Sequence, residues 1–139
     1  NFSSSSPARS ANTADTFKGA LYLSSATMNA ATTAYTGTGE VSGTGYTAGG
    51  VAVTNAVNPT SANTSPTAGT GYWTPSGNLV YSGVTLTTAF DTLLIYNSTQ
   101  GGRAVSVHTF GSQTITAGTF TLTMPSNTSS TALLRLATT

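Results

Sequence analysis

The side chains that could perform acid–base or metal chemistry are few in this sequence. His108 is the single histidine, and Asp15, Glu40 and Asp91 are the three acids. Triad catalysis needs a histidine beside an acid and a hydroxyl group, and a metal site needs several ligands that converge. His108 falls in a segment of alternating polar and apolar residues, which is typical of a polar strand residue at a surface or an interface. The sequence therefore predicts no enzyme, no metal site and no cofactor.

Thiol and nucleotide chemistry are equally unsupported. The chain has no cysteine, which excludes disulfides, thiolate ligands and thiol nucleophiles. Residues 38–50 are rich in glycine, but they lack the Gly-Lys-Ser/Thr ending of a phosphate-binding loop and the G-x-G-x-x-G spacing of a dinucleotide-binding turn. We therefore expect no small-molecule substrate.

Charge is scarce along the whole chain. Charged residues make up 5% of the sequence and the formal net charge is +1, whereas an ordinary soluble domain carries about 25% charged residues. Nucleic-acid-binding proteins cluster their basic residues, but here these are dispersed as Arg9, Lys18, Arg103 and Arg135. No apolar run approaches the roughly 18 residues of a membrane span, and residues 1–14 lack the apolar run of a signal peptide. We expect neither nucleic acid nor membrane as a partner, and a near-neutral surface suits a protein docked in an assembly.

The glycine-rich segment TGEVSGTGYTAGG, residues 38–50, has the most distinctive composition. It contains Gly39, Glu40, Gly43, Gly45, Tyr46, Gly49 and Gly50. Glycine permits a positive φ, and backbone N–H groups of a tight turn need acceptors. Glu40 therefore either binds a cation or a partner's arginine, or accepts hydrogen bonds from the loop and holds it. We favour the second interpretation.

The elements that position these residues are predicted to be short strands. Phe17–Leu23 is the first apolar run, residues 27–36 allow a short helix that Thr and Asn weaken, and residues 51–57 suggest a strand ended by Asn58-Pro59. Residues 60–71 are predicted to form a long loop. Five further segments follow: a strand at 79–86 with a bulge at Gly83, a central strand at 89–96 covered on both faces, a strand at 104–110 broken by Gly111, a strand at 119–124 with Phe120, Leu122 and Met124 on one face, and a last strand at 133–136.

This spacing predicts an all-β fold, a β-sandwich or jelly-roll-like single domain at residues 17–139. Residues 1–16 are predicted to form an extended N-terminal arm, because they are rich in Ser, Ala and Thr and offer little to bury except Phe2. A neighbouring subunit is the natural holder of this arm.

Four residues are candidates for an interface: Phe2, Arg9, Tyr72 and Arg103. Arg103 has two alternatives, an ion pair with Asp91 inside the fold or a pair with a partner's acid. For Trp73 the core is the expected place, whereas Tyr72 fits the core or an interface equally well.

The glycine-rich segment closely resembles a motif in a family of small virion structural proteins of tailed bacteriophages. The resemblance continues in order along the chain, through FKGAL at 17–21, Trp73, DTLLIYN at 91–97, GRAV at 102–105 with FGSQT at 110–114, and GTFTL at 118–122. Two parts depart from the family: the Ser-rich arm replaces a longer helix-like opening, and residues 60–71 are unusually rich in Ser, Thr and Pro.

The resemblance implies a structural role in the virion. The leading hypothesis is a capsid decoration, or cement, protein on the capsid exterior, assembled in the host cytoplasm. Its partners would be the major capsid protein and copies of itself, with a trimer as one arrangement. The alternatives are a tail, collar or fibre component, and a carbohydrate-binding or adhesive module that uses Tyr46, Tyr72 and Trp73.

Overall fold

A computed structural model describes residues 14–54, 59–61 and 69–137. Within these ranges the chain is all-β, as predicted, and it forms two antiparallel sheets. The strands are β1 (Phe17–Leu23), β2 (Val51–Ala52), β3 (Thr60–Ser61), β4 (Thr70–Trp73), β5 (Leu79–Asn97), β6 (Arg103–Leu122) and β7 (Leu134–Ala137). No helix in the described ranges is long and apolar enough to span a lipid bilayer.

The larger sheet has four strands in the order β2-β1-β5-β6. β5 lies inside this sheet between β1 and β6, and its residues 92–96 are all buried. The predicted central strand with both faces covered is therefore confirmed, as is the strand Phe17–Leu23, which pairs with Phe90–Asn97 of β5. A continuous apolar run suits this position because neither face of the strand meets water.

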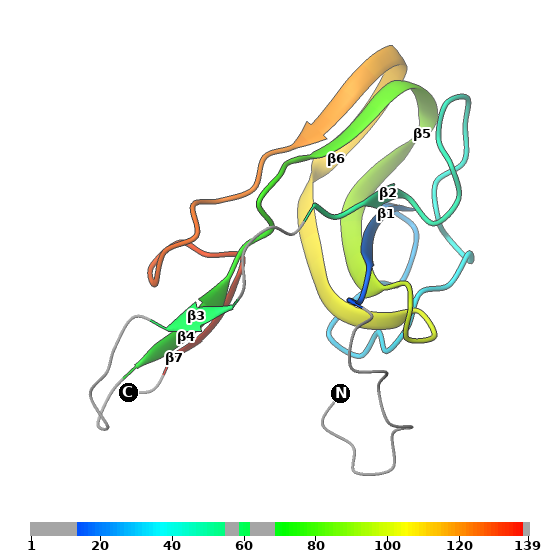
Figure 1. Cartoon of the computed structure of the whole chain (residues 1–139). Helices are drawn as coiled ribbons and strands as arrows, with labels where there is room; N and C mark the ends of the chain where they lie inside the picture. The colour runs from blue at the N-terminus through cyan, green and yellow to red at the C-terminus, as the bar shows by residue number, and fades with distance from the viewer. Residues whose placement is uncertain (1–13, 55–58, 62–68, 138–139) are drawn as a thin grey trace.

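The β5–β6 hairpin dominates the fold and bends strongly. Its strands contain 19 and 20 residues, and the ladder between them shifts register at several points. Such bulges bend a strand and increase its twist. Gly83, with a φ of 63°, lies at the first shift, where the sequence predicts a bulge. In Figure 1 the hairpin curves around β1.

The main core fills the inside of this curve. Tyr81, from the first half of β5, donates its hydroxyl to Gly19 O of β1 at 2.8 Å. Phe90, near the middle of β5, packs edge-on against Phe110 and Phe120 of β6, with ring centroids 6.0 and 5.1 Å apart. Aromatic pairs favour this geometry, and the two halves of the hairpin are thereby joined through one apolar cluster.

The smaller sheet has three strands in the order β3-β4-β7. In Figure 1 it lies at the lower left, beside the large sheet, and the two sheets do not stack face to face. The sandwich or jelly-roll arrangement is therefore not confirmed. Trp73 of β4 and Leu134 of β7 nevertheless pack against the main core, which attaches the small sheet to the rest of the molecule.

Several predicted elements are wrong in the described ranges. Residues 27–36 form no helix, because Asn29 Oδ1 accepts from Ala31 N and Thr32 Oγ1 from Asn29 N, and such local bonds compete with helix formation. Gly111 does not end a strand. The ladder advances from Phe90–Gln113 to Thr92–Thr109, so Gly111 lies in a bulge of a continuous β6.

The predicted loop at residues 60–71 begins and ends in strand, with β3 at Thr60–Ser61 and β4 from Thr70. The predicted strand at 51–57 is reduced to β2 in its described part, and the remainder lies outside the described residues. The last strand is confirmed as β7. Phe120, Leu122 and Met124 all pack against the main core, as their shared face predicted, although β6 ends at Leu122.

Candidate functional site: the cleft between the two sheets

Glu40 is the centre of a hydrogen-bond cluster that organises the glycine-rich segment. Its Oε1 accepts from Tyr46 Oη at 2.8 Å and from Gly49 N at 2.7 Å, and its Oε2 accepts from Tyr35 Oη at 2.6 Å. A carboxylate offers about four acceptor positions, so these three hydrogen bonds occupy most of the positions of Glu40. Hydrogen bonds to an ionised acceptor are stronger than neutral ones. Glu40 therefore holds the two ends of the segment together.

Backbone bonds fasten the same segment to β1 and β5. Val41 N donates to Leu21 O at 3.0 Å, and Thr85 N donates to Thr44 O at 2.9 Å. Tyr96 Oη donates to Gly49 O at 2.8 Å. Gly43 packs against Thr85, and Gly45 packs against Gly83. Only a residue without a side chain allows two backbones to approach this closely.

The phenols around Glu40 have pKa values raised above the ordinary value of tyrosine. The hydrogen bond to Glu40 raises the pKa of Tyr35, whereas burial, followed by the bond to Glu40, raises the pKa of Tyr46. Burial likewise raises the pKa of Tyr81. Protonated phenols can donate, which is what the Glu40 carboxylate needs. These hydrogen bonds are those of a cluster that holds the loop in place.

His108 forms no catalytic grouping with the described acids. Its Nε2 lies 2.8 Å from Ser106 Oγ, and burial lowers the pKa of the ring. Within the described ranges, no three histidine or acid side chains gather in a way that could hold a metal ion.

The expected ion pair between Arg103 and Asp91 is wrong. Arg103 pairs in the ladder with Asn97, at the turn of the β5–β6 hairpin. Asp91 lies six positions back along β5, which is about 20 Å at the usual rise of a strand. Its Oδ1 instead accepts from Thr92 Oγ1. The alternative, in which Arg103 meets a partner's acid, stays a prediction.

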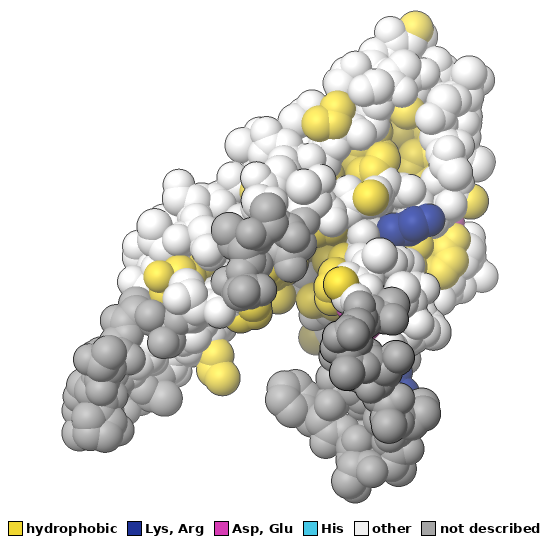
Figure 2. Space-filling model, in the orientation of Figure 1, with side chains coloured by type: hydrophobic (Ala, Val, Ile, Leu, Met, Phe, Trp, Pro, Cys, Tyr) yellow, Lys and Arg dark blue, Asp and Glu magenta, His cyan; other side chains and the backbone are white. Residues whose placement is uncertain are grey.

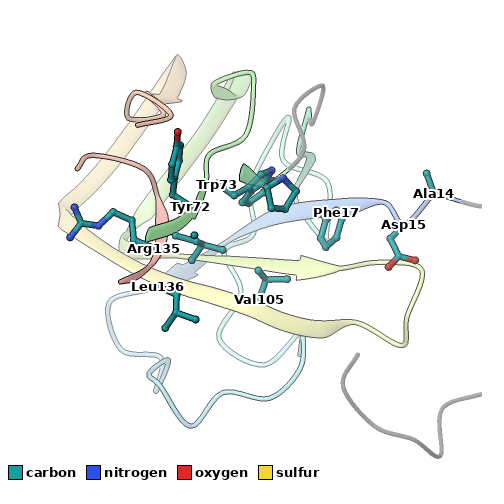
Figure 3. Close-up of a pocket in the computed structure, with 11 residues that line it drawn as sticks. Ala14, Asp15, Phe17, Tyr72, Trp73, Val105, Arg135 and Leu136 are labelled. Atoms are coloured by element: carbon teal, nitrogen blue, oxygen red, sulfur yellow. The ribbon is translucent and has the colours of Figure 1, made fainter. Parts of the chain in front are cut away.

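An apolar cleft of about 780 Å³ lies where the small sheet meets β1 and β6. Figure 2 shows hydrophobic side chains gathered where the lobe at the lower left joins the rest of the molecule. The cleft is lined by Ala14, Asp15, Phe17, Pro59, Gly71, Tyr72, Trp73, Val105, Leu134, Arg135 and Leu136. In Figure 3 Phe17, Trp73 and Val105 face the same space, whereas Tyr72 and Arg135 point away from it.

The pairing of β4 with β7 explains which side chains enter the cleft. Trp73 lies opposite Leu134 and Gly71 lies opposite Leu136, and alternate residues of a strand share a face. The inner face of the small sheet is therefore apolar along its length. Trp73 is only 8% exposed, but Leu136 is 79% exposed, because Gly71 gives it no side chain to pack against.

A bulge turns Val105 toward the same space. Ser106 pairs with Ile95 and Ala104 pairs with Tyr96, so Val105 is an extra residue that has no pairing partner in β5. Bulges commonly redirect a side chain in this way. Val105 is 39% exposed, and together with Leu136 it leaves apolar surface open at the mouth of the cleft.

The start of the described chain is fixed at the rim of the cleft. Asp15 accepts hydrogen bonds from Asn97 Nδ2 at 2.8 Å, Gln100 Nε2 at 3.1 Å and Thr99 Oγ1 at 3.2 Å. These donors lie at the end of β5 and in the turn that follows it. The described chain therefore begins at Ala14, a residue that lines the cleft.

The predicted interface residues fall in different places. Tyr72 is half-buried at the rim of the cleft, and Arg103 is exposed at the hairpin turn. Phe2 and Arg9 lie outside the described residues.

The aromatic residues of the adhesive alternative do not form a common platform. Tyr46 is bound to Glu40 in the segment before β2, Trp73 is buried, and Tyr72 lies in β4 of the small sheet.

Sequence reasoning missed Val105, Leu134 and Leu136 as parts of one site. The alternation of Leu134 and Leu136 signalled a strand with one apolar face, but only the strand pairing shows that Gly71 lies opposite Leu136 and leaves this end of the face exposed.

No protein-family model, curated protein or solved structure matches this chain.

Proposed function

We propose that this chain is a structural component of a tailed-bacteriophage virion, and that it decorates the capsid exterior as a cement protein. The family resemblance of the glycine-rich segment and of the strands after it supports this proposal. The observation that carries it in the structure is the apolar cleft, with Leu136 exposed on a chain that has almost no charge. Contiguous exposed apolar surface commonly marks a protein–protein interface.

The mechanism is the burial of apolar surface between the chain and its partners, the major capsid protein and further copies of this chain. Burial contributes about 25 cal/mol per Å² before the costs of association. Many copies on one shell add avidity without any new type of contact. Because seven of the 139 residues are charged, binding should change little with ionic strength.

The test is to locate and count the chain in purified particles. Cryo-electron microscopy should show its density in symmetric copies over the shell, and its abundance should be comparable to that of the major capsid protein. Density confined to the tail or collar, in few copies, would overturn decoration and favour the alternative virion position.

A binding experiment then tests the cleft itself. Shells assembled without this chain should bind the purified protein, and Leu136→Ser should weaken binding about tenfold. Val80→Ser is the matched control, because Val80 is also an exposed apolar residue, at 43%, but is not among the residues that line the cleft. Equal binding by both variants would remove the cleft from the interface.

A further inference from the structure

We infer that the end of β6 pairs with the same strand of a second copy of this chain, so that the two large sheets join across a two-fold axis at Thr121. The residues involved, 119–123, are not among those that line the cleft. The inference therefore concerns a different surface and does not rest on the proposed function.

The first reason is the place of β6 in the large sheet. The order β2-β1-β5-β6 puts β6 at the border of this sheet. In Figure 1 its last part, drawn in orange, runs along the outside of the molecule. At its start the same border already accepts an added segment, since Ala104 N donates to Thr33 O at 2.9 Å. A border strand pairs with a strand of another chain through the N–H and C=O groups of its outer side.

The composition of β6 does not protect this border. Proteins commonly discourage pairing at a sheet border with charged residues, proline or bulges. Residues 104–122 contain no proline and no Lys, Arg, Asp or Glu. The ladder with β5 does contain bulges, but its last three pairs, which join Leu79–Tyr81 to Phe120–Leu122, are in regular register. The end of β6 is therefore the part of this border that suits a further strand.

The second reason identifies the partner as a second copy. Residues 119–123 are Thr-Phe-Thr-Leu-Thr, an alternation that is symmetric about Thr121. In an antiparallel pair centred on Thr121, Phe120 lies opposite Leu122 of the second copy, and threonine lies opposite threonine. Directly opposite side chains share one face of a sheet, so the apolar faces of the two sheets coincide. This match favours a second copy over an unrelated strand.

The side chains at this border would gain contacts from such a pair. Phe120 and Leu122 are half-buried and pack against the main core, whereas Thr119 and Thr121 are exposed on the opposite face. A second β6 extends the apolar layer beside Phe120 and Leu122, and the two-fold axis provides each contact twice. The net charge of +1 adds little repulsion between the copies.

Disulfide trapping tests the register in the full chain, which has no cysteine of its own. Thr121→Cys places two thiols opposite each other at the two-fold axis. Thr119→Cys is the matched control, because Thr119 is also an exposed threonine of β6 but faces Thr123 of the second copy. The two copies of position 119 would then lie four positions apart, which is about 14 Å along the strand. A disulfide joins Cα atoms about 4.4–6.8 Å apart, so linked dimers should form roughly tenfold faster with Thr121→Cys than with Thr119→Cys.

Sedimentation velocity measures the association without a covalent link. The protein should exchange between monomer and dimer at concentrations between about 1 µM and 1 mM, as expected of a small interface. Thr121→Lys and Thr121→Glu each place like charges opposite each other, so each should weaken its own dimer roughly tenfold. An equal mixture of the two variants should form mixed dimers, because a lysine then faces a glutamate. Thr87→Lys is the control, since it adds the same charge at an exposed threonine of β5, and it should leave the dimer unchanged.

Three outcomes would overturn the inference. Equal rates of linking at positions 121 and 119 would show that the thiols meet by random collision. A protein that stays monomeric at about 1 mM, or forms a trimer, would remove the two-fold pair. A mixture of Thr121→Lys and Thr121→Glu that stays monomeric would contradict the register. All of these measurements use the isolated protein, so they are independent of the count of this chain in purified particles, which tests the proposed function.

Discussion

Alanine substitutions at three glycines distinguish two energetic costs of adding a side chain to this fold, backbone strain and steric overlap. Gly101 has a φ of +65° and open space around it, so alanine there adds backbone strain alone. Gly43 has no positive φ, but a Cβ there would overlap Thr85 O and lie 3.1 Å from Leu86 Cδ2. Gly50 combines both conditions.

At Gly50 the φ is +73°, and an added Cβ would overlap Gly19 O and lie 2.8 Å from Ala20 Cα. The atoms that it meets belong to the backbone of β1, which cannot rotate away as a side chain can. Gly50→Ala must therefore separate the glycine-rich segment from β1 or distort both.

The magnitudes follow from the two costs. A left-handed backbone costs an alanine about 1–2 kcal/mol, and the stiffer unfolded chain returns about 0.4–1 kcal/mol, so Gly101→Ala should lose about 1 kcal/mol. Overpacking costs about 1–3 kcal/mol, so Gly43→Ala should lose about 2 kcal/mol. Gly50→Ala combines the two and should lose about 3 kcal/mol, a large part of the roughly 5–15 kcal/mol that stabilises a typical domain.

Urea denaturation measures these losses as changes in the free energy of unfolding. Circular dichroism reports the sheets, and the fluorescence of Trp73, the single tryptophan, reports the junction between them. Gly111→Ala is the control, because Gly111 has open space and no positive φ, and it should be neutral or slightly stabilising. A loss at Gly50→Ala no larger than the loss at Gly101→Ala would contradict the packing of the segment on β1.

Three further outcomes are expected. Glu40→Gln removes the charge from three hydrogen bonds and should lower the free energy of unfolding by about 2 kcal/mol; Asp91→Asn, the matched control, should lose under about 1 kcal/mol, and equal losses in urea denaturation would contradict the role of Glu40. Burial lowers the pKa of His108, so the unfolded state binds more protons and stability should fall as pH drops below about 6.5; His108→Gln should flatten this slope in urea denaturation at several pH values, and an unchanged slope would assign it to other groups. The raised pKa values of Tyr35 and Tyr46 mean that the unfolded state loses protons first above about pH 10, so stability should fall there; an alkaline titration should show their phenolate absorbance only as circular dichroism is lost, and full phenolate absorbance from a folded chain would count against the cluster.

The sequence predicted the elements whose pattern is set by burial alone. Phe17–Leu23, which is apolar apart from Lys18 and Gly19, and the continuous apolar run around Leu94 both lie in strands of the large sheet. Gly111 misled the prediction, since a glycine ends a strand only where nothing else continues the ladder, and here the pairs at Thr109 and Gln113 continue it. Local signals cannot show this, because the pairing partner lies in another part of the chain.

The candidate site was predictable only in part. That Glu40 would bond to its own loop followed from the backbone N–H groups of a tight turn, which need acceptors, and Gly49 N is indeed one donor. Tyr35 as a second donor left no sequence signal, because its role depends on the packing of residues 34–40 beside β1. The cleft could not be predicted from the sequence, because Val105 and Leu136 lie 31 positions apart and line the same cleft only as a result of how the two sheets are placed.

The pairing of β1 with β5 also sets the order in which the chain is able to fold. Phe17 pairs with Asn97, and Tyr81 bonds to Gly19 across 62 positions. A ribosome adds about 5–20 residues per second, so β1 is made roughly 4–15 s before its partner strand is complete. During that interval its apolar residues have no sheet to join. Folds dominated by such distant contacts also tend to fold slowly, in milliseconds to seconds, so newly made chains should depend on chaperones that hold β1 until the hairpin arrives.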